Sequence, residues 1–166
     1  QSGDEYDRLL AEGVRYASKD DFRREAKAYR EAIALRPDRP VAYFNLGAVL
    51  NSSAHYVEAA QRYLEARERY QVVGSKNWAE ATAWAFGMLT MEACAEVAKP
   101  EWWNDEGLKA MSARVVRAAP NDGQSNQMRA AVLGGAYSLF WKVGRRSAAE
   151  LKEAATHYDR AAALCP

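Results

Sequence analysis

The chain has 166 residues, of which 49% are hydrophobic and 27% charged, and its formal net charge at pH 7 is +1. This length and balance predict one globular domain, residues 1–166, with enough apolar residues to bury a sizeable core. Because basic and acidic residues are nearly equal in number, we expect neither nucleic acid nor an anionic membrane surface as a partner.

The cysteines and the start of the chain bear on its compartment. Cys94 and Cys165 are the only cysteines, and neither has another Cys or a His at metal-site spacing. The sequence therefore predicts no metal and no disulfide scaffold, and it favours a reducing, cytoplasmic setting. It contains no run of about 18 apolar residues and no signal-peptide pattern. The chain starts at Gln1 rather than at a methionine, so the removal of an earlier segment stays open.

The first half contains an internal repeat of amphipathic helical units. Gly13 and Gly47 are 34 positions apart. The same interval separates Phe22 from Tyr56, Tyr29 from Tyr63, and Ala32 from Ala66. Proline removes a helical donor and clashes with the preceding turn, so the prolines are expected between helices. All five lie at such breaks: Pro37, Pro40, Pro100, Pro120 and Pro166.

This order of small and aromatic residues resembles the tetratricopeptide repeat, a pair of antiparallel helices about 34 residues long. The first unit matches at Gly13, Tyr16, Phe22, Tyr29, Ala32 and Pro37, and the second at Tyr43, Leu46, Gly47, Tyr56, Ala59, Tyr63 and Ala66. The chain departs from the family pattern at Glu25, where alanine is preferred, and at Gln71, where proline would close the unit.

The second half resembles the family in the same order but with longer units. Gly87 and Pro120 are 33 positions apart, whereas Gly13 and Pro37 are 24 apart. We expect the surplus in longer helices and turns around "VAKPEWWNDEG" and "WKVGRRSAAE". Asn104 or Asp105 is expected to cap one second helix, and Ser147 with Glu150 the other. The fourth unit matches at Leu133, Gly134, Tyr137, Ala154, Tyr158, Ala161 and Pro166.

The predicted fold is all-α, a right-handed α-solenoid of about four helix-turn-helix repeats of which the last two are elongated. The expected repeats are residues 5–38, 39–72, 77–120 and 124–166. No catalytic residue is predicted, because neither His55 nor His157 has a partner at a fixed spacing and Gly134-Gly135 lacks a phosphate-loop context. We accordingly expect no enzyme and no cofactor.

The resemblance implies a concave face, lined by the first helix of each repeat, that binds a protein or peptide partner. The family's positions on either side of the glycine define this groove. They are Leu10, Val14, Phe44, Asn45, Ala48, Trp84, Met88, Met91 and Met128. Methionine and aromatic side chains suit an apolar or amphipathic segment. The alternative, that the Met and Trp positions pack on one another as core, stays open.

Two further observations concern the partner. Family members that hold acidic chaperone tails use a clamp of basic and amide residues, and only Asn45 matches that clamp here, so a chaperone tail is disfavoured. Trp102 and Trp103 cannot both face the same side of a helix, because neighbouring residues point about 100° apart. They are expected either to provide a secondary contact with the partner or to fill the core at the end of the hairpin.

The sequence therefore predicts a noncatalytic protein–protein interaction scaffold. One alternative is a self-assembling module, a dimer or filament formed by stacking of repeats at the end after Leu164. Another is a substrate-docking domain excised from a larger enzyme.

Overall fold

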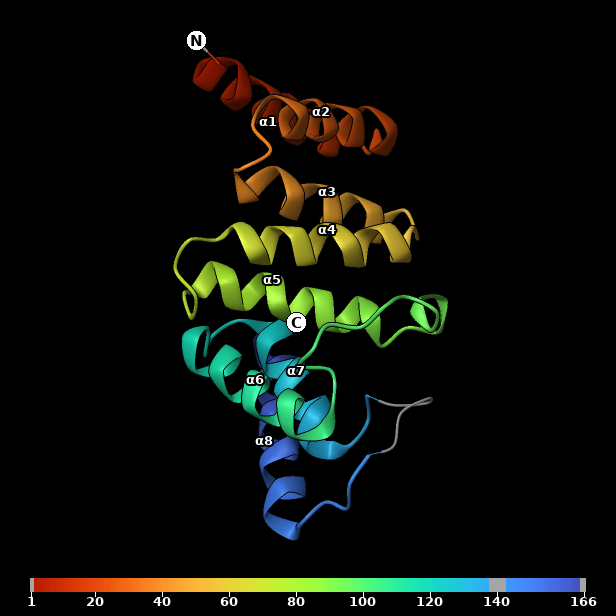
Figure 1. Ribbon diagram of the computed structural model, residues 1–166, viewed down its shortest axis with the longest axis vertical. Coiled ribbons are helices and arrows are strands. Elements are labelled where there is room, and N and C mark those ends of the chain that lie inside the picture. Colours follow the sequence, from red (N-terminus) through yellow and green to blue (C-terminus); the bar gives the residue numbers. More distant parts are fainter. Residues whose placement is uncertain (1, 138–142, 165–166) are drawn as a thin grey trace.

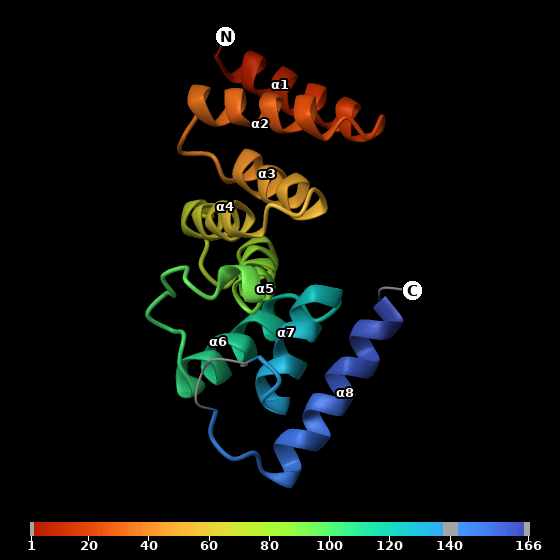
Figure 2. The ribbon, with the colours of Figure 1, turned by 90° about the vertical axis from the view of Figure 1, so that its right-hand side faces the viewer.

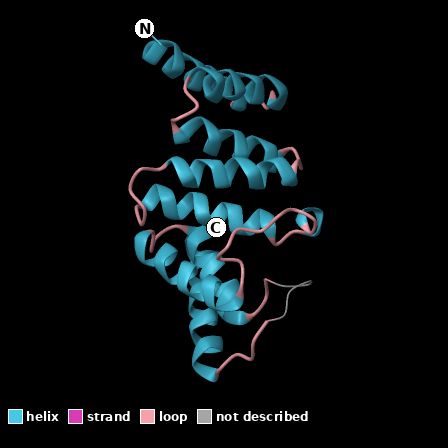
Figure 3. Ribbon diagram, in the orientation of Figure 1, coloured by secondary structure: helices cyan, strands magenta, loops and turns pink. Residues whose placement is uncertain are grey.

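The computed structural model describes residues 2–137 and 143–164, and every regular element in those ranges is helical (Figures 1 and 3). The elements are α1 (Ser2–Ala17), α2 (Phe22–Leu35), α3 (Pro40–Ser52), α4 (Tyr56–Arg69), α5 (Lys76–Leu89), η1 (Glu92–Cys94), α6 (Asp105–Ala118), α7 (Gly123–Gly134) and α8 (Ala148–Leu164). Together they form an α-solenoid of helical repeats, as the sequence predicted.

Local signals fix where these helices begin. Pro40 occupies the first turn of α3, where its missing donor costs nothing. The Asn104 side chain accepts a hydrogen bond from the Gly107 amide at 2.8 Å and so caps α6. Ser147 and Glu150 form the reciprocal capping box of α8, with bonds of 3.1 and 2.9 Å. These caps confirm the predicted helix starts.

Glycine sets how closely the helices of a hairpin approach. A side chain at Gly13 would overlap the ring of Tyr29, and a Cβ at Gly47 would lie 2.9 Å from the ring of Tyr63. The first two hairpins therefore pack a tyrosine of the second helix directly on the backbone of the first.

The third unit departs from that packing. Gly87 of α5 faces Gln124 of α7, whose Nε2 lies 2.7 Å from where a Cβ would be. The same Gln124 amide donates to the Ala83 carbonyl at 3.5 Å. α5 therefore packs against α4 and α7 as well as α6, and one contiguous core runs from α2 to α7.

The extra residues of the third unit lie in its connection. α5 and α6 have 14 residues each, the same as α2 and α4, so the expectation of longer helices is wrong for this unit. Residues 90–104 instead fold back onto the core through η1, where Cys94 is completely buried and burial raises the pKa of its thiol. In the fourth unit α8 has 17 residues, and part of "WKVGRRSAAE" lies outside the described residues.

The two ends of the solenoid differ in chemistry. α3 buries three apolar side chains against α2, and the positions 34 residues earlier in α1 are charged. The buried residues are Ala42, Leu46 and Val49, and their counterparts are Arg8, Glu12 and Arg15. At the opposite end α8 packs against α7 along one side only (Figure 2), with Ala154 and Ala161 as its buried residues.

Candidate functional site

An aromatic stack joins the first helices of the central hairpins. The Phe44 ring meets Tyr63 edge-on at 5.4 Å between centroids, and Tyr63 stacks on Trp84 at 5.9 Å and 18°. Tyr63 is buried, which raises the pKa of its hydroxyl and keeps it neutral, while Phe44 and Trp84 are each partly exposed. The structure thus brings Phe44 of α3 and Trp84 of α5 together over one buried ring.

The other positions predicted for the groove in α1 and α3 are exposed or partly buried. Val14 is 58% exposed, Ala48 is exposed, and Leu10 packs partly buried against the core. Asn45 lies beside Phe44 and is only partly buried. We call the set Leu10, Val14, Phe44, Asn45, Ala48 and Trp84, which the sequence predicts as the lining of a groove, the aromatic groove.

The methionines occupy different environments from one another. Met88 is 6% exposed and Met128 is completely buried, so neither presents a side chain to a partner, and a methionine-rich lining is wrong for these two positions. The reason is the packing of α7 onto α5, which turns that part of the predicted surface into core. Met91 is partly exposed.

Of the two tryptophans in the connection between α5 and α6 (residues 90–104), one belongs to the core and the other lies partly at the surface. Trp103 is 5% exposed and packs on Phe86 at 5.4 Å and Tyr137 at 6.5 Å between centroids. Trp102 is partly exposed, and the Arg67 guanidinium lies 5.3 Å from the centre of its ring. Trp103 is therefore a core residue, and only Trp102 retains a surface that a partner could contact.

Arg67 is held between two indoles. Its guanidinium lies 5.1 Å from the Trp78 ring centre and donates to Thr82 Oγ1 at 2.9 Å. Arg114 approaches the same Trp78 ring at 5.0 Å. Burial, and then the charge of Arg114, lower the pKa of Arg67. These contacts of Arg67 hold α4, α5 and the connection between α5 and α6 together.

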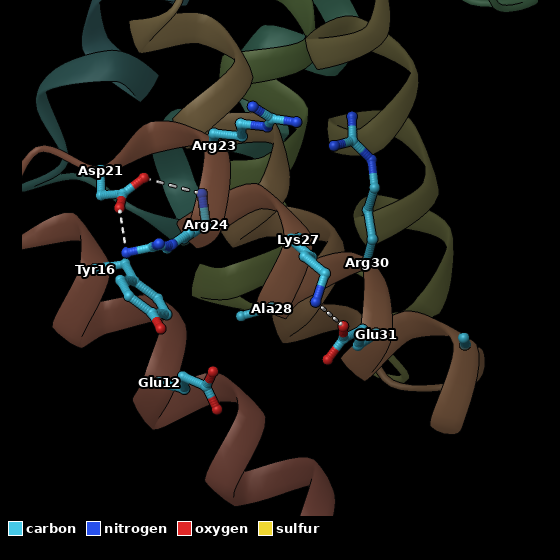
Figure 4. A pocket seen from close by; sticks show the side chains of 10 residues that line it. Glu12, Tyr16, Asp21, Arg23, Arg24, Lys27, Ala28, Arg30 and Glu31 are labelled. Atoms are coloured by element: carbon cyan, nitrogen blue, oxygen red, sulfur yellow. Dashed lines mark hydrogen bonds and ion pairs between the residues drawn. The ribbon is translucent and has the colours of Figure 1, made fainter.

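A charged cavity of about 940 Å³ lies along α1 and α2 (Figure 4). Glu12 and Tyr16 line it from α1, each two residues from Val14 and so on roughly the opposite side of that helix. Its α2 side chains largely neutralise one another, with Lys27 2.9 Å from Glu31 and Arg24 3.5 Å from Asp21. The signal for it in the sequence is a run of basic residues on one face of α2: Arg23, Arg24, Lys27 and Arg30.

The described residues contain no candidate metal site and no candidate membrane-spanning helix. Within residues 2–137 and 143–164, no group of three or more His, Cys, Asp or Glu side chains is placed to hold a metal ion. In the same ranges no helix has the length and apolar character needed to cross a membrane.

Comparison with known proteins gives a fold. No family model and no curated protein matches the chain. Among solved structures, a crystal structure of MamA superimposes with a TM-score of 0.62 at 13% identity, over 96% of this chain and 77% of that one. At this identity the likeness concerns the fold alone, and it supports the tetratricopeptide-like helical-repeat architecture that the sequence resemblance implies.

Proposed function

We propose that this protein is a noncatalytic interaction scaffold that binds an apolar or amphipathic segment of another protein along the aromatic groove. The observation that carries the proposal is the Phe44–Tyr63–Trp84 stack, in which a buried ring holds two partly exposed aromatic side chains in fixed positions. Its helical-repeat fold is typical of protein-binding scaffolds.

Rigid aromatic rings suit this role. Phe44 and Trp84 are already ordered by Tyr63, so little side-chain entropy is lost when a partner covers them. Each large apolar side chain that the partner buries there would contribute about 1.5–3 kcal/mol before the cost of association. Val14 and Ala48 extend the apolar surface, and the Asn45 amide supplies a hydrogen bond to the main chain of the segment.

The groove can be tested without a known partner by selecting a random peptide library on the immobilised protein. Peptides recovered in this way should bind Val14→Asp and Trp84→Ala about tenfold or more weakly than wild type in calorimetric titrations. Val14 is 58% exposed, so its substitution should leave folding intact. The matched control is Val72→Asp, because Val72 is 66% exposed and lies in the α4–α5 connection.

The same titrations can contradict the proposal. Peptides that bind both groove variants as tightly as wild type, but lose affinity to Arg23→Ala, would move the site to the charged cavity on α2. Recovery of only acidic peptides would likewise argue against an apolar groove.

A further inference from the structure

α8 carries an exposed apolar stripe with the spacing of a coiled-coil seam. Its members recur at intervals of three and four residues, the heptad pattern of helices that pair along their length. They are Ala148, Leu151, Ala155, Tyr158 and Ala162. Leu151 is 50% and Tyr158 37% exposed, and the three alanines are exposed as well.

Two of the five stripe positions correspond to residues that α4 buries. Ala155 and Tyr158 occupy the repeat positions of Ala60 and Tyr63 in α4, which are 0% and 1% exposed. α5 packs on α4 at that face. On α8, Ala155 is exposed and Tyr158 is 37% exposed, with one edge of the Tyr158 ring 4.0 Å from where a Cβ at Gly134 of α7 would be.

The charged residues beside the stripe are complementary to the same residues on a second, antiparallel copy of α8. The ion pairs that α8 forms within the described residues use Glu150, Glu153 and His157. Lys152 and Asp159 are exposed, seven residues apart, and flank the stripe on one side. In an antiparallel pair of α8 helices related by a two-fold axis at Ala155, Lys152 of each copy would face Asp159 of the other, and Leu151 would face Tyr158.

We infer that α8 docks on α8 of a second copy of this chain, forming a two-fold symmetric dimer. The small side chains at Ala148, Ala155 and Ala162 let the two helices approach closely, and Leu151 and Tyr158 fill the space between them. Stacking on the other end of the molecule is disfavoured, because it would bury Arg8, Glu12 and Arg15 of α1. The symmetric contact therefore closes at two copies rather than growing into a filament.

The experiment is sedimentation equilibrium on the full chain from about 1 µM to about 1 mM, a range that captures weak dimers. We expect the mass of wild type to rise from one copy to two. Leu151→Glu should remain a monomer, whereas Val72→Glu, at an exposed valine elsewhere, should dimerise like wild type. Circular dichroism at low concentration checks that all variants fold.

A charge swap tests the geometry. Lys152→Asp alone places like charges in apposition at two symmetric points, and we expect it to raise the dimer dissociation constant about tenfold. The double variant Lys152→Asp with Asp159→Lys should recover the wild-type value. A constant monomer mass, a mass beyond two copies, a single variant that dimerises normally, or loss of the dimer in Val14→Asp would each overturn the inference.

Discussion

At the scale of single residues, the glycines that face tyrosine rings fix how closely the first two hairpins pack. Gly13 and Gly47 each lie 16 residues before the tyrosine that covers them, so the repeat interval itself predicts the pair. The ring lies where a side chain would otherwise be, and it is buried on its remaining sides.

We expect Gly47→Ala to lower the free energy of unfolding by about 1–3 kcal/mol, because the new methyl group would lie 2.9 Å from the buried Tyr63 ring and force it to move. Gly134→Ala is the matched control. Its nearest neighbour would be Ala154 Cβ at 3.7 Å, an ordinary contact, so the change should be neutral or stabilise by up to about 1 kcal/mol. Urea unfolding measures both, and a Gly47→Ala protein as stable as wild type would contradict the packing account.

The positions at which residue-level prediction failed share one cause. Counting from Gly87 placed Met88 in the groove on the assumption that Gly87 has the surroundings of Gly47. At Gly87 the side chain of Gln124 from α7 lies where the tyrosine ring lies at Gly47. Nothing in the 34-residue interval indicates this approach of α7 to α5. Leu10, Val14 and Phe44 come from the first two units, where the 34-residue interval holds, and there the counted positions lie partly or fully at the surface.

At the scale of elements, α6 is tied to the segment that leads into α8 by a network of charges. Arg146 donates to both carboxylate oxygens of Asp105, at 2.7 and 2.9 Å, and the Tyr137 hydroxyl donates to Asp105 at 2.8 Å. Lys109 lies 2.7 Å from Glu150 in the first turn of α8. The Arg146 side chain is only 6% exposed, so the pair with Asp105 compensates a charge that is largely withdrawn from water.

This network should make the C-terminal part of the molecule sensitive to acid. The hydrogen bonds from Arg146 lower the pKa of Asp105 to about 2. A carboxyl group whose pKa is lowered in the folded state stabilises the fold at pH values above its unfolded pKa of about 4, and this contribution is lost as the pH falls toward 2. For Asp105 the contribution is about 1 kcal/mol after solvent screening.

Asp105→Asn should therefore lower stability at pH 7 and flatten its decline between about pH 4 and pH 2, as followed by denaturant unfolding at each pH. Glu31→Gln serves as control, because the ion pair that Glu31 forms within the described residues is with the exposed Lys27 and contributes little. An unchanged acid profile in Asp105→Asn would show that the network does not govern the acid response.

The helices could be predicted from the sequence more completely than the connections between them. Capping residues and proline positions mark helix ends locally, so Ser147 and Glu150 could be assigned without a structure, and the α6 cap could be narrowed to Asn104 or Asp105, of which the structure shows Asn104. Whether Trp102 and Trp103 are core or surface depends on where residues 90–104 run, and that is decided by tertiary contacts with Phe86 of α5 and Arg67 of α4.

At the scale of the whole molecule, stability should vary along the solenoid because each repeat depends mainly on its neighbours. The core is deepest where α4 and α5 meet, with Tyr63, Trp78 and Ala79 almost completely buried. α8 lies at one end and rests on α7 alone over most of its length.

Native-state hydrogen exchange at low protein concentration should accordingly show the amides of α8 exchanging well before those of α4 and α5. The difference arises because opening α8 exposes few apolar side chains, whereas opening α4 exposes the centre of the core. Protection of α8 equal to that of α4 under these conditions would contradict the assignment of α8 as a terminal, weakly packed helix.

The irregular packing at Gly87 also limits how long a bound segment can be. Because α7 packs on α5 and buries Met88, the proposed binding residues lie on α1, α3 and α5. The proposed partner is thus recognised through one short linear motif.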